Sequence, residues 1–170
     1  MKKHYSRRGD DGTSATMAGK RVEKDNLVFE LLGTLDEANA TLNLAAVQID
    51  KKEYWELMGI IQKDLQLIMA EAAGDKKSQL KPEKIEWLEK EIDKLGECIL
   101  MPDEFITAWT KPASAMLNLA RTIVRRAERT AVKYARSQGN TNPLWVRYLN
   151  RLSSLLFILQ LVLENPPLTG

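Results

Sequence analysis

Four arginines and one glutamate crowd into a short stretch of the chain, Arg121-Thr-Ile-Val-Arg-Arg-Ala-Glu-Arg129. The apolar residues around them recur at three- and four-residue spacing, which predicts a helix. One polar face of this helix would carry Asn118, Arg121, Arg125, Glu128 and Arg129. Crowded guanidinium groups repel one another, and each donates two parallel hydrogen bonds to a phosphate or carboxylate. The stretch predicts a polyanion site on a rigid helix; the alternatives are a solvated face and a salt-bridge network between subunits.

Glycines and anion-binding side chains also gather near the N-terminus, in Ser6-Arg-Arg-Gly-Asp-Asp-Gly-Thr-Ser14. Closely spaced glycines let backbone amides approach an anion, and hydroxyl and guanidinium groups add further donors. The segment lacks the Gly-Lys-Ser/Thr ending of a Walker phosphate-binding loop. Taken alone, it is more typical of a flexible terminal tail than of a binding loop.

Two other polar groups interrupt apolar segments. Asp36, in Gly33-Thr-Leu-Asp-Glu-Ala-Asn39, follows a core position, so we expect it to be partly buried and to need an arginine partner. The alternative is a carboxylate on a helix surface. Asn150, in Tyr148-Leu-Asn-Arg-Leu-Ser153, is suited to orienting a bound group or else marks the edge of the core.

The elements that would position these residues are helices. Apolar stripes with a helical period run over 31–49, 54–68, 85–95, 116–132 and 146–163. Asp25 is the expected N-cap of the first helix, and Pro82 and Pro112 suit first helical positions. No segment shows the alternation of a strand. We predict one all-α domain over 1–170, an antiparallel five-helix bundle at 27–165 preceded by a glycine-containing arm at 1–26.

Composition narrows the class of protein. The 170 residues carry a net charge of only +2, too small for nucleic acid to be a bulk electrostatic partner. Cys98 is the single cysteine, which favours a reducing compartment and excludes an internal disulfide. No apolar stretch reads as a signal peptide or is long enough to span a bilayer, so we expect a cytoplasmic protein. The lone histidine, His4, excludes zinc and di-iron sites built on histidine pairs.

In chain order, four segments together resemble the PduO-type ATP:cob(I)alamin adenosyltransferases. They are Tyr5-Ser-Arg-Arg-Gly-Asp-Asp-Gly-Thr13, Gly33-Thr-Leu-Asp-Glu-Ala-Asn39, Ala120-Arg-Thr-Ile-Val-Arg-Arg-Ala-Glu-Arg129 and Tyr148-Leu-Asn-Arg-Leu-Ser153. The resemblance covers nearly the whole chain. It implies a five-helix bundle that forms a homotrimer with active sites between subunits. It also implies an enzyme that transfers the 5′-deoxyadenosyl group of ATP to the cobalt of cob(I)alamin and releases triphosphate.

The resemblance also implies roles for individual residues. Asp36 and Arg121 would form a bridge between subunits, and Phe105 would press on the lower face of the corrin. Trp109 has no counterpart in the family pattern; in an active enzyme we expect it to take the place of the family's glycines and close over the corrin. Arg125 would act on the leaving triphosphate, and Glu128 would lie on the side of the Mg²⁺ that ATP brings. The residues expected to bind ATP are Ser6, Arg7, Arg8, Gly9, Thr13, Ser14, Lys24, Arg125, Arg126, Glu128, Arg129 and Asn150. The implied partners are a cob(II)alamin reductase or an enzyme that uses adenosylcobalamin.

The sequence departs from the family pattern on the expected corrin side. Thr107-Ala-Trp-Thr-Lys111 stands where the family has Leu-Pro-Gly-Gly-Ser, and Asn118 stands where it has histidine. Ser154 replaces an aspartate and Gln66 a phenylalanine. Two hypotheses follow. The protein is a divergent active adenosyltransferase, which we favour, or an ATP-binding paralogue that senses nucleotide or carries adenosylcobalamin without transferring the adenosyl group.

Overall fold

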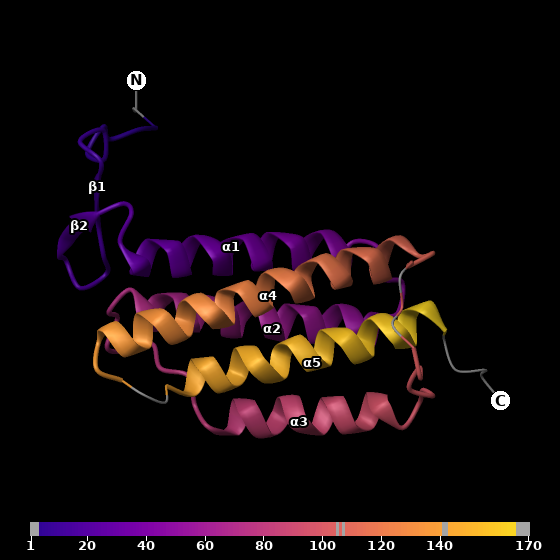
Figure 1. The fold of residues 1–170 in the computed structure, drawn as a ribbon. Helices are drawn as coiled ribbons and strands as arrows, with labels where there is room; N and C mark the ends of the chain where they lie inside the picture. Colours follow the sequence, from indigo (N-terminus) through magenta and orange to yellow (C-terminus); the bar gives the residue numbers. More distant parts are fainter. Residues whose placement is uncertain (1–3, 105, 107, 141–142, 166–170) are drawn as a thin grey trace.

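The computed structural model describes residues 4–104, 106, 108–140 and 143–165 (Figure 1). These residues form five helices and one two-stranded sheet. In chain order the elements are β1 (Thr13–Ala15), β2 (Arg21–Glu23), α1 (Leu27–Ala46), α2 (Lys52–Ala72), α3 (Glu83–Gly96), α4 (Pro112–Ser137) and α5 (Leu144–Glu164). The predicted helical bundle is confirmed.

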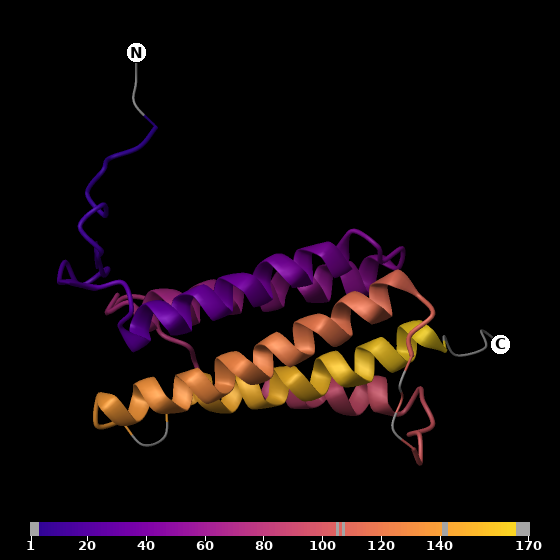
Figure 2. The same ribbon diagram turned by 45° about the horizontal axis from the view of Figure 1, so that its top comes forward.

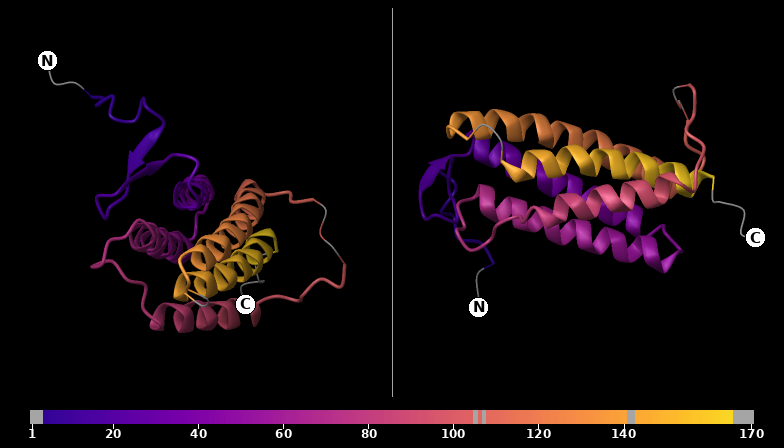
Figure 3. Two further views of the ribbon diagram at one scale, coloured as in Figure 1. Left: turned by 60° about the vertical axis from the view of Figure 1, so that its left-hand side comes forward. Right: turned by 90° about the horizontal axis from the view of Figure 1, so that it is seen from below.

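Each helix runs opposite to the one before it along the chain (Figures 1 and 2). α1 packs against both α2 and α4, and α5 packs against α4 and α3. α3 and α5 therefore lie side by side and run in the same direction, as the end view in Figure 3 also shows. α4 sits between α1 and α5, so its two edges meet different helices and its outer face stays open to a ligand or to another subunit.

Most of the predicted helix ends are found in the structure. α1 begins at Leu27 and α4 begins at Pro112, whose fixed φ suits a first helical position. Gly139, just beyond α4, has φ +72°, a conformation that glycine adopts without strain. The prediction that Asp25 caps α1 is wrong. The cap is Asn26, whose Oδ1 accepts a hydrogen bond from the Val28 amide at 3.1 Å.

The arm contains strands that the sequence pattern did not predict. β1 and β2 pair antiparallel, with Ser14 opposite Val22. Arg21 forms an ion pair with Asp11 at 3.2 Å. The pKa of Asp11 lies below its ordinary value, because the Thr13 amide and hydroxyl donate to it and because of the charge on Arg21. The segment is thus a small hairpin and not an irregular tail.

The hairpin is attached to the end of α2. The Ala18 amide donates to the Ala73 carbonyl at 3.2 Å. A Cβ at Gly74, which has φ +93°, would meet the Ala18 Cβ at 2.8 Å, so this contact requires glycine. The arm is therefore held on the side of α1 and α2, away from α5 (Figure 3).

α5 is the most apolar helix. It is long and apolar enough to cross a membrane by length and composition, but 61% of its most apolar window is buried inside the bundle. Its leucines face α3 and α4 and form much of the core. Core packing accounts for this composition.

One polar cluster, with a buried carboxylate, joins three helices near the end of the bundle where α3 and α5 begin. Asp64 of α2 is 1% exposed. It accepts a hydrogen bond from the Tyr148 hydroxyl of α5 at 3.0 Å and forms an ion pair with Lys84 of α3 at 2.7 Å. Burial, and then the negative charge of Asp64, raise the pKa of Tyr148 well above its usual value. Tyr148 therefore stays a neutral donor at physiological pH.

Candidate functional site

The arginine face of α4 is present as predicted. Arg125 and Arg129 lie one turn apart on the exposed surface of the helix. Neither forms an ion pair within the part of the chain that the structure describes. Two uncompensated guanidinium groups on a rigid helix make a surface that attracts a polyanion.

Arg121 extends this face toward the N-terminal half of α4. Its Nε and Nη2 donate to Asn118 Oδ1 at 3.2 and 2.9 Å, so the guanidinium group is held by a neutral amide. Partial burial, and then the charge of Arg125, lower the pKa of Arg121. Repulsion between neighbouring guanidinium groups is the cost that a bound anion would offset.

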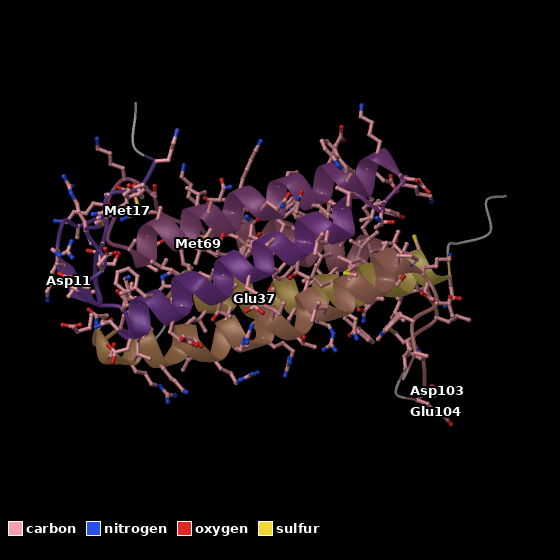
Figure 4. All side chains as sticks on the ribbon, turned by 90° about the horizontal axis from the view of Figure 1, so that it is seen from above. Asp11, Met17, Glu37, Met69, Asp103 and Glu104 are labelled. Atoms are coloured by element: carbon pink, nitrogen blue, oxygen red, sulfur yellow. The ribbon has the colours of Figure 1, made fainter. Side chains whose placement is uncertain are left out.

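The two edges of the arginine face are tied to neighbouring helices. Arg126 forms an ion pair with Glu37 of α1, so it lies at the α1 edge, separate from Arg125 and Arg129. Figure 4 shows Glu37 midway along the bundle. On the other edge, Glu128 Oε1 accepts a hydrogen bond from Asn150 Nδ2 of α5 at 3.0 Å. The structure thus brings Glu128 and Asn150 together beside Arg125.

Asn150 is oriented by a chain of contacts that begins on α3. Glu89 accepts a hydrogen bond from Arg151 Nε at 2.7 Å. Arg151 Nη1 donates to Asn150 Oδ1, also at 2.7 Å. Because the amide oxygen accepts from Arg151 while the amide nitrogen donates to Glu128, both ends of the Asn150 side chain are fixed.

A hollow of about 360 Å³ adjoins the Arg121 end of the arginine face. We call it the loop-end hollow; its walls include Asp103, Trp109, Asn118, Arg121, Phe157 and Gln160. Trp109 is half-buried there, next to a segment fixed to the end of α5. Glu164 accepts hydrogen bonds from the Thr110 amide at 2.9 Å and from its hydroxyl. Phe105, expected beneath the corrin, lies outside the described residues, as does Thr107.

The arm residues contact one another more than the helices. Lys24 Nζ donates to the Gly9 carbonyl at 2.6 Å, and the Lys24 amide donates to Gly12, which has φ +81°. A Cβ at Gly9 would lie 3.1 Å from Lys24 Nζ, so glycine permits this approach. Among the described residues, no hydrogen bond or ion pair joins the arm to the arginines of α4.

Asp36 differs from its prediction. It is exposed, not partly buried, and the described residues supply it with no ion pair. It lines a second hollow of about 610 Å³, the arm-end hollow, together with Met17, Phe29, Leu32, Gln66 and Met69. In Figure 4, Met17 and Met69 lie toward one end of the bundle, and Asp103 and Glu104 lie at the other. Asp36 and Arg121 border different hollows, and no ion pair joins them among the described residues.

Three structural features were missed from the sequence. Gln160 is a polar residue within the apolar stripe of α5, yet it is fully buried in the wall of the loop-end hollow. The Glu89–Arg151 contact and the Asp64 cluster were not foreseen, because each joins residues on separate helices. A charged residue at a buried position of α2 was the one available signal for the Asp64 cluster.

A helical bundle with an open arginine face beside a partly apolar hollow has the features of a site for a polyanion together with a larger, mostly apolar group. The family model for cobalamin adenosyltransferase matches residues 4–163. The chain belongs to the cobalamin adenosyltransferase family, as the ordered motifs predicted.

Several similar proteins carry the name of this activity. The corrinoid adenosyltransferase PduO of Salmonella typhimurium is 37% identical over 161 residues, which cover 91% of this chain but 48% of that protein, so the chain spans about half its length. A corrinoid adenosyltransferase of Citrobacter freundii is 33% identical over 98% of both chains. None of these names favours a nucleotide sensor or carrier.

The fold also matches solved structures. A variant PduO-type ATP:corrinoid adenosyltransferase from Lactobacillus reuteri, complexed with cobalamin and ATP, superimposes with a TM-score of 0.86. It is 24% identical, and the match covers 95% of this chain and 91% of that one. This likeness establishes the five-helix fold.

Proposed function

We propose that this chain is an ATP:cob(I)alamin adenosyltransferase. In the reaction, the electron pair of cobalt(I) forms a bond to C5′ of ATP, and the bond between C5′ and the triphosphate oxygen breaks. The products are adenosylcobalamin, with cobalt formally oxidised to cobalt(III), and triphosphate. Cobalt(I) is itself a strong nucleophile, so the protein need only position C5′ and stabilise the charge that grows on the triphosphate.

The observation that carries this proposal is the uncompensated arginine face of α4. Arg125 and Arg129 have no carboxylate partner among the described residues, and the pKa of Arg121 is lowered by partial burial and then by the charge of Arg125. A triphosphate would remove that repulsion and accept bidentate hydrogen bonds. Arg126 joins the phosphate side by exchanging its contact with Glu37 for one with the nucleotide.

The carboxylate of Glu128 is assigned to the side of the Mg²⁺ that enters with the triphosphate, and the fixed amide of Asn150 suits the other end of the nucleotide. Because Asn150 is held at both ends, it is preorganised to hold the ribose or adenine without losing side-chain freedom on binding.

The arm, residues 1–26, is the second nucleotide-binding element of this single-domain chain. It would supply Ser6, Arg7, Arg8, Gly9, Thr13, Ser14 and Lys24. Its attachment to α2 keeps it away from the arginine face of its own chain. An arm that meets the arginine face of a neighbouring subunit satisfies this geometry, which supports a homotrimer with sites between subunits.

The corrin occupies the loop-end hollow, because that hollow has an apolar wall and borders Arg121. Trp109 and Phe157 offer aromatic faces to a flat macrocycle, and their burial against it excludes water from the cobalt. Phe105 is assigned to the lower corrin face. A cob(II)alamin reductase and an enzyme that uses adenosylcobalamin are the proposed partners, and the reducing cytoplasm is the proposed compartment.

An anaerobic assay tests the proposed function. Purified protein is mixed with ATP, Mg²⁺ and chemically reduced cobalamin, and the absorbance change of the new cobalt–carbon bond is followed. We expect turnover that requires both substrates, with triphosphate released in equal amount. Binding of ATP without any binding of cobalamin would instead identify the non-transferring paralogue.

The trimer is tested through Asp36 and Arg121. We expect Asp36→Asn or Arg121→Ala alone to weaken assembly by about 2 kcal/mol or more per contact, since each leaves one charge unpaired at the interface. The double variant should assemble better than either single variant, because no stranded charge remains. Sedimentation velocity of the three variants measures this.

Asp93→Asn is the matched control, because Asp93 is an exposed helical carboxylate on α3. It should sediment like the unchanged protein. A monomer at micromolar concentration in the unchanged protein would rule out the assembly.

A further inference from the structure

Gln160 of α5 is buried among leucines, yet its amide has no partner. The side chain is 0% exposed, and neither Oε1 nor Nε2 forms a hydrogen bond with any described residue. A buried, unpaired amide destabilises a fold, and native proteins leave very few such groups. An apolar residue would fit the surrounding core better, so the amide needs an explanation outside the bundle's own packing.

Its location supplies that explanation, because Gln160 forms part of the wall of the loop-end hollow. A second amide, Asn118, lies in the same wall. Asn118 Oδ1 is already occupied by Arg121, which leaves Nδ2 as a further donor toward the hollow. Gln160 therefore holds one unpaired donor and one unpaired acceptor within the wall of a cavity whose other walls include Trp109 and Phe157.

A primary carboxamide is the group that satisfies both atoms of such a side chain. Its N–H donates to Oε1 while its carbonyl accepts from Nε2, so two hydrogen bonds form side by side. A phosphate would leave Oε1 unpaired, and a purely apolar ligand would leave both atoms unpaired. A corrinoid combines a broad apolar ring with primary carboxamides around its rim, which matches the aromatic and amide walls together.

We propose that Gln160 recognises a peripheral carboxamide of the corrinoid and so selects the amidated form of the second substrate. This inference rests on the proposed function. Arg121 lines the loop-end hollow and neighbours Arg125, so a ring anchored at Gln160 lies beside the arginine face that holds the triphosphate. The contact fixes the rotation of the ring about the cobalt, in addition to adding affinity.

The test compares two corrinoids on two proteins. Cob(II)alamin, and a cobalt(II) corrinoid whose carboxamides are replaced by methyl esters, are titrated by absorbance in the presence of ATP and Mg²⁺. The proteins are the unchanged chain and Gln160→Met, which keeps a similar volume without the amide. We expect Gln160→Met to raise the Kd for cob(II)alamin about tenfold, the effect of losing a hydrogen-bonded pair.

The methyl ester corrinoid should bind the unchanged protein about tenfold more weakly than cob(II)alamin does, and Gln160→Met should not weaken it further. Without corrinoid, Gln160→Met should melt at an equal or higher temperature, because it removes an unpaired amide. Its Kd for ATP should not change. Gln48→Met, at an exposed position beyond α1, is the control and should bind both corrinoids like the unchanged protein.

Each outcome of these titrations either supports or overturns the contact between Gln160 and a corrinoid carboxamide. Equal weakening of both corrinoids by Gln160→Met, or no weakening of either, overturns the amide contact while leaving the transferase intact. Failure of the unchanged protein to bind any corrinoid overturns the proposed function itself. If Gln160→Met does not fold, the two corrinoids are compared on the unchanged protein alone. Equal affinity of that protein for the amide and ester corrinoids contradicts the proposal.

Discussion

Replacing Arg125 with alanine is expected to lower the rate of adenosyl transfer by about 10²- to 10³-fold, comparable to the loss of one donor from an oxyanion hole. Arg125 lies in the middle of the arginine face and has no ion pair among the described residues, so its charge is free to act on the leaving triphosphate. The interaction strengthens as charge develops, so kcat should fall more than the affinity for ATP. The anaerobic absorbance assay gives both parameters.

Arg125→Lys should restore only part of the rate. An ammonium group supplies the charge but not the planar pair of donors that a phosphate accepts. Arg136→Ala is the matched control, since Arg136 is an exposed arginine in the last turn of the same helix. Circular dichroism should show equal helix content in all three variants. Equal kcat in Arg125→Lys and the unchanged protein would remove Arg125 from this role.

The helices of this chain could be predicted because each carries a long apolar stripe with a period near 3.6 residues. The hairpin could not be predicted in this way. Its strands, Thr13–Ala15 and Arg21–Glu23, are too short to show alternation, and the ion pair of Arg21 joins β2 to Asp11, a residue ten positions earlier that lies outside both strands. The N-cap of α1 was missed by one position, which is the usual margin for a helix end.

The arginine face could be predicted because all its members lie on one helix. Asp36 was misjudged because one residue along a helix is a rotation of about 100°, which carries it from the buried side of Leu35 to the surface. Contacts between helices could not be predicted from the sequence. Arg151 and Glu89 are 62 positions apart, and Tyr148 and Asp64 are 84 apart, so no local pattern reports either pair.

The Asp64 cluster leads to the second large expected effect. Asp64→Ala should lower the free energy of unfolding by about 3 kcal/mol, the lower end of the range for breaking a buried ion pair. The Tyr148 hydroxyl would lose the one acceptor that the described residues supply to it inside the core. We expect the lower end of this range of free energies because the Lys84 side chain is 37% exposed and lies over the Trp87 ring. Its charge therefore remains solvated when the carboxylate is removed.

Asp64→Asn separates the hydrogen bond from the ion pair, because its amide oxygen still accepts from Tyr148. It should cost about 1 kcal/mol, as expected for weakening a hydrogen bond to a charged acceptor. Asp93→Ala, at an exposed position on α3, should stay within about 0.5 kcal/mol of the unchanged protein.

Urea unfolding followed by circular dichroism measures all three variants, at fixed protein concentration because assembly adds to stability. If Asp64→Ala unfolds at the same urea concentration as Asp93→Ala, the cluster contributes nothing to holding α2, α3 and α5 together, and the position of Tyr148 must be fixed by its ring packing alone.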